Sequence, residues 1–166
     1  NWVRVGDAPA NAERVFAMDS LHIWMLQGNT LLRSENGGAG WENYPGAGVG
    51  AMWFSDALHG WQVGAGGSIV HSDDGGQNWS PQQSGTTVQL NAVQFVDGQT
   101  GWAVGDDGVI LATTNGGTRW VQQESPVSVN LYALHFRDAL TGWVVADQGV
   151  ILHTTTGGYE PEPTAT

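Results

Sequence analysis

The sequence predicts an all-β fold, a β-propeller of four four-stranded blades. The first reason is a repeat of about 41 residues that runs through the 166-residue chain. The second is that each copy consists of short β-branched and aromatic runs separated by clusters of Gly, Asp and Asn. The third is that no stretch has the 3.6-residue apolar period of a helix. The 25 Gly and 9 Trp residues indicate many tight turns and a core built from large rings.

Composition and charge narrow the classes of function. Five basic residues, all Arg, face sixteen acidic residues, and the formal net charge of −11 repels phosphate backbones and anionic membranes. The absence of Cys excludes disulfides, thiolate metal sites and Cys nucleophiles. No apolar run approaches the roughly 20 residues that span a bilayer, so no membrane span is expected. Since residue 1 is Asn rather than Met, we expect that upstream sequence was removed.

The first half of each unit carries an Asp followed five residues later by a Trp. An apolar run before the Asp is the expected first strand, and the Trp lies in the second strand. An Asp at this turn can accept hydrogen bonds from backbone N–H groups, so we interpret it as structural. The pairs are Asp19 and Trp24, Asp56 and Trp61, Asp97 and Trp102, and Asp138 and Trp143.

The second half of each unit carries a Ser/Thr-x-Asp/Asn-x-Gly-x-x-Trp signature after a short apolar third strand. We interpret its polar residues as turn-forming and its last Gly as a residue with positive φ, while its Trp opens the fourth strand. The copies are Ser34, Asn36, Gly38 and Trp41; Ser72, Asp74, Gly76 and Trp79; and Thr113, Asn115, Gly117 and Trp120. The last copy keeps Thr154, Thr156 and Gly158 but has Pro161 in place of the Trp.

The two ends of the chain are complementary in sequence. The last unit lacks a fourth-strand Trp, whereas residues 2–5, Trp-Val-Arg-Val, resemble residues 120–123, Trp-Val-Gln-Gln. We therefore predict that the N-terminal strand closes the last blade, which would remove an exposed sheet edge. Residues 1–158 are the expected propeller domain, and the Pro/Thr-rich residues 159–166 are the expected start of a linker or tail.

Two motifs resemble known repeats. The element from Ser72 to Trp79 resembles the Asp-box, or bacterial neuraminidase repeat (BNR). The longer pattern from Phe95 to Gly117 resembles the repeat of the photosystem II assembly/stability factor family, and the resemblance covers roughly residues 12–158. It implies a β-propeller that acts as a binding scaffold, without catalysis or cofactor, in an exported compartment. The chain departs from the family in having four units instead of about seven and in lacking an Arg-rich surface.

Catalytic and metal sites find little support in the residue pattern. A sialidase would need an Arg cluster and a Tyr nucleophile with an acidic partner, but the five Arg fall at different positions of the repeat. We therefore predict a non-enzymatic protein. A pair of glycosidase carboxylates remains an alternative, because such a pair is defined by the distance between its two carboxyl groups, which the sequence does not give. The five His lack ligand spacing, so no metal site is expected.

The candidate binding residues lie on the face that varies between the units. Turns between first and second strands and between third and fourth strands must share one face, which is occupied by the repeated residues. The opposite face varies, and variation on a constant scaffold is where binding usually occurs. The candidates on it are Arg14, Asn91, Tyr132, Asp106, Asp107, Asp147 and Gln148.

Three functions remain for such a module. The favoured one is a non-catalytic, exported scaffold for a protein partner. The second is a carbohydrate-binding or glycosidase-like Asp-box module. The third is a self-assembling unit in which two chains exchange strands into an eight-blade ring. The sequence leaves open the ligand, the compartment and whether the chain is a piece of a larger propeller.

Overall fold

The structure is a computed structural model that describes residues 1, 12–28, 30–45 and 50–159. The described residues form fifteen strands and three short 3-10 turns. Across these residues there is no helix long and apolar enough to cross a bilayer. The strands are β1 (Arg14–Ala17), β2 (Ile23–Gln27), β3 (Thr30–Ser34), β4 (Glu42–Pro45), β5 (Gly50–Phe54), β6 (Gly60–Gly64), β7 (Ile69–Ser72), β8 (Ser80–Gln82), β9 (Leu90–Phe95), β10 (Gly101–Gly105), β11 (Ile110–Thr113), β12 (Val121–Gln123), β13 (Leu131–Phe136), β14 (Gly142–Ala146) and β15 (Ile151–Thr154). The 3-10 turns are η1 (Ala65–Gly67), η2 (Asp106–Gly108) and η3 (Asp147–Gly149).

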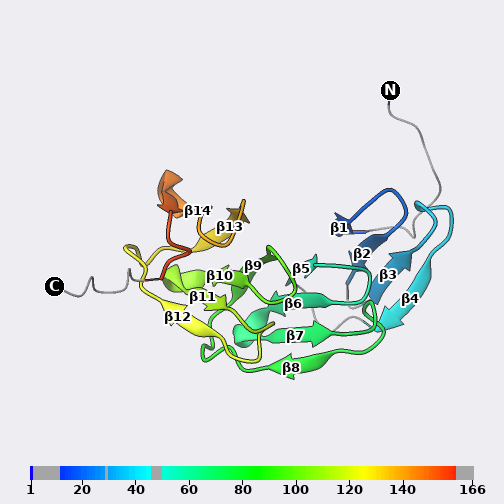
Figure 1. Cartoon of the computed structure of the whole chain (residues 1–166), viewed down its shortest axis with the longest axis horizontal. Coiled ribbons are helices and arrows are strands. Elements are labelled where there is room, and N and C mark those ends of the chain that lie inside the picture. The colour runs from blue at the N-terminus through cyan, green and yellow to red at the C-terminus, as the bar shows by residue number, and fades with distance from the viewer. Residues whose placement is uncertain (2–11, 29, 46–49, 160–166) are drawn as a thin grey trace.

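The predicted all-β class is confirmed by four antiparallel sheets, one for each sequence unit. Sheets 1, 2 and 3 contain β1–β4, β5–β8 and β9–β12, and sheet 4 contains β13–β15, each in chain order. Consecutive sheets contact each other through their first strands, β1 with β5, β5 with β9 and β9 with β13. The sheets follow one another along an arc, from β1–β4 at one end to β13–β15 at the other (Figure 1).

Sheet 4 has three strands among the described residues, whereas the other sheets have four. The segment predicted to supply the fourth strand, residues 2–5, lies outside the described residues. Closure of the last blade by the N-terminal strand therefore stays a prediction. The same holds for the boundary at residue 158, because residues 160–166 also lie outside the described part of the chain.

The core is built at the junctions between sheets, where a second-strand Trp stacks on a first-strand Phe of the next sheet. Each of these three Trp side chains is fully buried. Nearly parallel rings in close contact combine a large apolar area with a favourable aromatic geometry. The ring centroids lie 4.1 Å apart for Trp24 and Phe54, 3.7 Å for Trp61 and Phe95, and 3.6 Å for Trp102 and Phe136.

Each junction also contains a hydrogen bond that joins the two neighbouring sheets. The indole Nε1 of the second-strand Trp donates a hydrogen bond to a glycine carbonyl in the Asp-box turn of the next sheet, so the buried N–H is satisfied. The donor–acceptor distances are 3.0 Å from Trp24 to Gly75, 3.2 Å from Trp61 to Gly116, and 2.9 Å from Trp102 to Gly157. The repeated turn therefore has a structural function, which is to present a carbonyl to the preceding sheet.

The turn after each first strand is organised by its Asp. Asp97 shows the pattern, since its Oδ1 accepts hydrogen bonds from the backbone N–H groups of Gln99 (2.7 Å) and Thr100 (2.6 Å). The same two bonds form at the other three Asp residues. At Asp19 these bonds, led by the one from the His22 backbone, lower the carboxyl pKa to about 2.

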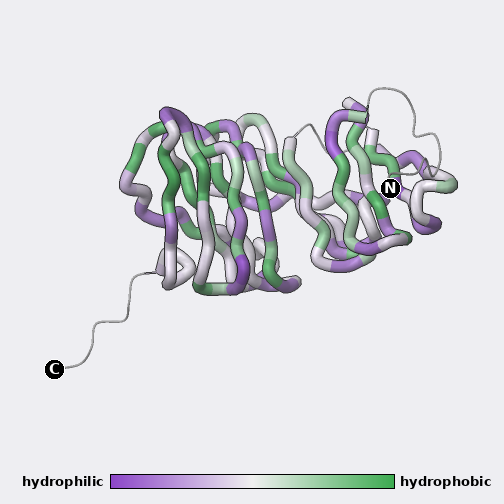
Figure 2. Tube along the Cα trace, turned by 90° about the horizontal axis from the view of Figure 1, so that it is seen from above, coloured by the Kyte–Doolittle hydropathy of each residue, from purple (hydrophilic) through white to green (hydrophobic). Residues whose placement is uncertain are grey.

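The Asp-box turns are closed by a hydroxyl. In sheet 2, Ser72 Oγ accepts the backbone N–H of Gly76 at 2.8 Å, and Gly76 has a φ of 98°, which suits a residue without a side chain. A hydrogen bond from the Gly75 N–H to the Leu58 carbonyl places this turn beside the Asp turn of the same sheet. We call the face formed by both kinds of turn the Asp-box face. Strands stand side by side with their turns at two opposite faces (Figure 2).

Both ends of the arc leave apolar side chains uncovered. In sheet 4, Trp143 is 39% exposed, although its three counterparts in the other sheets are fully buried. At the other end Val15 is 67% exposed, whereas the equivalent Met52 and Val93 are 9% and 6% exposed. Sheet 1 therefore does not cover sheet 4 in the described structure, and the arc is open.

Replacing Phe136 tests the junction between sheets 3 and 4. We expect Phe136→Ala to lower the free energy of unfolding by about 3–5 kcal/mol, because it removes the ring stacked on Trp102 and leaves a cavity. Urea denaturation measures this change. The control is Leu140→Ala at a 57% exposed position, where we expect a change within about 0.5 kcal/mol. Equal losses in the two variants would contradict the description of the core.

Candidate binding face

The face opposite the Asp-box face is formed by the 3-10 turns and by the segments that precede the first strands. Backbone hydrogen bonds join the two kinds of segment, from Asp106 N–H to Gln89 O and from Asp147 N–H to Asn130 O, both at 2.9 Å. These two bonds fix the turns without using side chains. The side chains therefore differ between sheets without loss of the scaffold, and we call this surface the variable face.

Sheets 3 and 4 meet on the variable face in a polar network. The amide Nδ2 of Asn91 donates to Asp106 Oδ1 at 2.8 Å and to the Leu131 carbonyl at 2.9 Å. The Asp107 backbone N–H donates to Asn130 Oδ1 at 3.3 Å. Asn91 was predicted as a binding residue, and the structure places its amide as a bridge between the two sheets.

Tyr132 and Asp147 extend this network into sheet 4. Tyr132 is 49% exposed, and its hydrogen bond with the Asp147 carboxylate raises the pKa of its hydroxyl above the usual value. We call Asn91, Asp106, Asp107, Tyr132 and Asp147 the acidic rim. The rim combines three carboxylates with an exposed aromatic ring, a set that can bind cations and apolar groups together.

The two exposed turn residues have an unusual backbone. Asp107 and Gln148 occupy the left-handed region with φ of 55° and 60°, where sheet 2 has Gly66. These are the two non-glycine residues with positive φ in the described chain. Such conformations are costly for residues with a side chain and cluster at functional sites. Because η1, η2 and η3 share this conformation at the same position, it is a feature of the repeated turn.

Arg14, the remaining candidate, lies next to the rim rather than in it. It is the first residue of β1 and lines a 250 Å³ hollow together with Gly50, Ala65 and Gln89. Gln89 links this hollow to the rim, because its carbonyl accepts the hydrogen bond from Asp106 N–H. The seven candidates therefore lie on one face, six of them on sheets 3 and 4.

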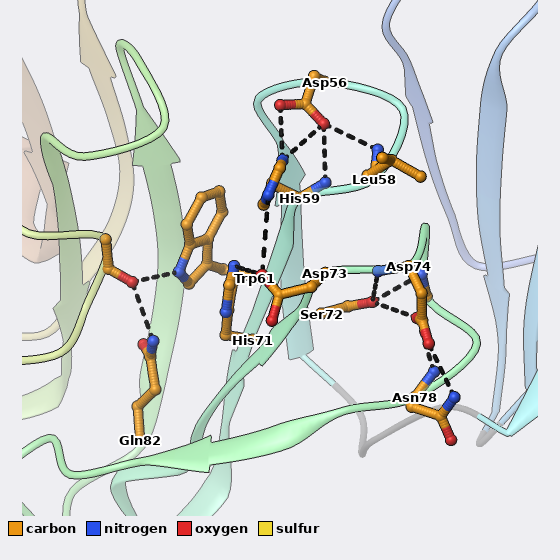
Figure 3. Close-up of polar contacts among 12 residues, drawn as sticks. Asp56, Leu58, His59, Trp61, His71, Ser72, Asp73, Asp74, Asn78 and Gln82 are labelled. Carbon is orange, nitrogen blue, oxygen red and sulfur yellow. Dashed lines mark hydrogen bonds and ion pairs between the residues drawn. The ribbon is translucent and has the colours of Figure 1, made fainter.

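A second polar cluster, on the Asp-box face of sheet 2, was missed by sequence reasoning (Figure 3). His59 Nδ1 lies 2.8 Å from Asp56 Oδ2, and the two imidazole rings of His59 and His71 stack with centroids 6.1 Å apart. Asp73 Oδ1 lies between them, 3.7 Å from His59 Nε2 and 3.5 Å from His71 Nε2. The strand register could have revealed this cluster, because His71 pairs with Trp61 and His59 precedes that Trp by two residues.

This cluster adjoins a structural junction and is sensitive to protons. The His71 ring stacks on Trp61 with centroids 4.7 Å apart, and burial lowers the pKa of His71 below its usual 6.5 while Asp73 partly opposes this. Neutral His71 is therefore favoured in the folded state. No group of three or more His, Cys, Asp or Glu suited to a metal ion occurs among the described residues.

Comparisons with known proteins agree with this architecture. Residues 47–124 match the family model described as "Photosynthesis system II assembly factor YCF48". The structure of YCF48 from Cyanidioschyzon merolae is 21% identical with a TM-score of 0.76, and the match covers 86% of this chain and 50% of that protein. This chain thus spans half the length of that relative. No curated protein matches the sequence.

Two further structures extend the comparison. "YCF48 bound to D1 peptide" is 16% identical with a TM-score of 0.59, covering 90% of this chain and 80% of that one. A GH74 enzyme from Niastella koreensis is 15% identical with a TM-score of 0.70, covering 84% of this chain and 26% of the enzyme. At this level of identity, the resemblance to the enzyme is one of fold alone.

The protonation of His71 is directly measurable. We expect its pKa, followed by NMR of the imidazole protons, to lie below 6.5, and we expect Asp73→Asn to lower it further by removing the opposing charge. Because the folded-state pKa is depressed, this group's contribution to stability is complete above pH 6.5 and is lost as the pH falls through the folded-state value. A His71 pKa at or above 6.5 would show that the ring is not buried as described.

Proposed function

We propose that this chain, a member of the photosystem II assembly factor-like family of BNR β-propellers, is a non-catalytic scaffold module that binds a protein partner at its acidic rim. The single observation that supports this proposal best is the rim itself. Its three carboxylates stand on turns held by backbone hydrogen bonds, and its exposed tyrosine lies near the start of β13, on the face that varies between repeats. We further propose that the module acts in an exported compartment, as the family resemblance implies.

Charge favours a basic segment as the occupant of the rim. The chain carries a net charge of −11, and the rim gathers Asp106, Asp107 and Asp147 on two adjacent turns. Complementary charge speeds association and suppresses binding of acidic partners. An extended peptide with Arg or Lys side chains can pair with the carboxylates, and an apolar side chain can pack on Tyr132.

The structural relatives support a peptide over a carbohydrate. One YCF48 structure is bound to a D1 peptide, so a protein with a similar fold binds a protein segment. The GH74 enzymes share the fold at lower coverage of their own length. The carbohydrate-binding or glycosidase-like function therefore serves as the competing outcome of the test.

A peptide array tests the proposal. Extended peptides graded from acidic to basic are presented to the full chain, with a glycan array in parallel, and we expect the signal to rise with basic charge on the peptides alone. The triple variant Asp106→Asn, Asp107→Asn, Asp147→Asn should weaken binding at low salt by about tenfold or more, mainly through slower association.

The matched control removes one charge from the opposite face. Asp73 is exposed on the Asp-box face, and Asp73→Asn should leave peptide binding unchanged. Binding to glycans without binding to any of the peptides would overturn the proposal. So would peptide binding that the triple variant and the Asp73→Asn control reduce equally.

A further inference from the structure

A cavity lies where the first strands of sheets 1, 2 and 3 contact one another. It has a volume of 410 Å³ and is lined by the last residues of β1, β5 and β9 and by the residues that follow them. Phe16 and Trp53 supply aromatic walls, and Asp97 is the one charged residue of this lining. The volume is within the range of small-molecule sites in proteins.

The repeat does not account for the first of these features, Trp53. Its position, opposite the second-strand Trp of the same sheet, is occupied in the other sheets by Phe16, Gln94 and His135. In sheet 3 this position joins two sheets, because the Gln94 side chain exchanges two hydrogen bonds with the Phe136 backbone, at 2.9 and 2.7 Å. A Trp side chain has one donor and no acceptor, so it cannot replace this pair of bonds.

The contacts of Trp53 also differ from those of the junction Trp residues. Trp53 is half-buried, and its indole N–H has no hydrogen-bond partner among the described residues, whereas the three junction Trp residues donate to glycine carbonyls. Trp53 meets Phe16 edge to face, with centroids 5.1 Å apart and an interplanar angle of 64°. Rings inclined in this way form a corner, as the walls of an aromatic cage do.

The second feature is an unpaired carboxylate oxygen on Asp97. In all four Asp turns Oδ1 accepts two backbone N–H groups, and in three of them Oδ2 also contacts an imidazole or a guanidinium. These three pairs are Asp19 with His22 (2.8 Å), Asp56 with His59 (2.8 Å) and Asp138 with Arg137 (2.9 Å). Sheet 3 has Thr100 at the position of the two His, and Asp97 Oδ2 has no basic partner among the described residues. A negative charge is therefore left exposed at the edge of the cavity.

Aromatic walls beside an unpaired carboxylate attract an organic cation. The faces of the rings attract positive charge, and the net charge of −11 raises the local concentration of cations. The polar side chains of the lining are Ser55 and Asp97, which provide few acceptors for the three N–H donors of a primary ammonium group. A quaternary ammonium group has no N–H donor, and its methyl groups pack on apolar walls. The lining therefore favours a quaternary over a primary ammonium group.

We propose that this cavity binds a small organic cation that carries a quaternary ammonium group. The methyl groups of the ligand pack against Phe16 and Trp53, and its charge faces Asp97 Oδ2. This site is separate from the acidic rim, because Asn91 of the rim and Asp97 lie at opposite ends of β9. The proposal therefore does not depend on the proposed function.

Titration of the full chain with choline chloride, followed by calorimetry and by NMR of the N-methyl protons, tests this proposal. We expect saturable binding and an upfield shift of the methyl signal, because the protons lie over aromatic rings. The neutral isostere 3,3-dimethylbutan-1-ol and the primary amine butylammonium should each bind more weakly than choline by about tenfold. Trp53→Leu should weaken choline binding by about tenfold or more, with Trp53→Phe milder. Trp143→Leu, at a 39% exposed Trp outside the cavity, is the matched control and should have no effect.

A pair of charge variants separates the carboxylate from the fold. Asp97→Asn keeps an Oδ1 acceptor for the turn but removes the charge, and it should weaken choline binding by about threefold or more. Asp138→Asn makes the same change in sheet 4, where Oδ2 is paired with Arg137, and should leave binding unchanged. Urea denaturation of each variant verifies that it is folded. Absence of choline binding, equal affinity for choline and either of the other two probes, or equal losses in the two Asp variants would each show that the cavity is not a quaternary ammonium site.

Discussion

The stack of a second-strand Trp on a first-strand Phe of the next sheet is the interaction on which the rest of this structure depends. It occurs three times with nearly the same centroid distance, and each time the indole N–H is tied to an Asp-box carbonyl of the next sheet. One contact therefore sets both the spacing of neighbouring sheets and the position of their turns. The burial of three Trp side chains in this way gives a small, cysteine-free chain a substantial core.

The two faces of the structure differ in how far their side chains can vary, and this difference determines where a binding site can lie. The Asp-box face is occupied by hydroxyl, carboxylate and glycine groups that hold turns and junctions, so it tolerates little change. The turns of the variable face are held by backbone hydrogen bonds, and the Asn91 and Asn130 side chains join sheets 3 and 4, so the other side chains of this face are available for recognition. The acidic rim uses this freedom at the junction of sheets 3 and 4, where Asn91 also ties the two sheets together.

Most of the fold could be predicted from the sequence because each repeat specifies the same arrangement of strands and turns. The Asp-to-Trp spacing indicated the strands, and the turn at Asp97 binds its backbone as expected of such a turn. Contacts that do not recur from one repeat to the next could not be predicted in this way. The meeting of His59 and His71 across Asp73 depends on strand register, and the exposure of Trp143 depends on which sheet follows it in space.

A double-mutant cycle on Trp61 and Phe95 tests the role of the stack most directly, because the junction between sheets 2 and 3 lies inside the arc. Urea denaturation of Trp61→Leu, Phe95→Leu and the double variant gives the coupling free energy between the rings. We expect a favourable coupling of about 0.5–1.5 kcal/mol beyond the loss of buried area. Additive single losses, with no coupling between the two rings, would contradict the conclusion that the aromatic pair fixes the junction.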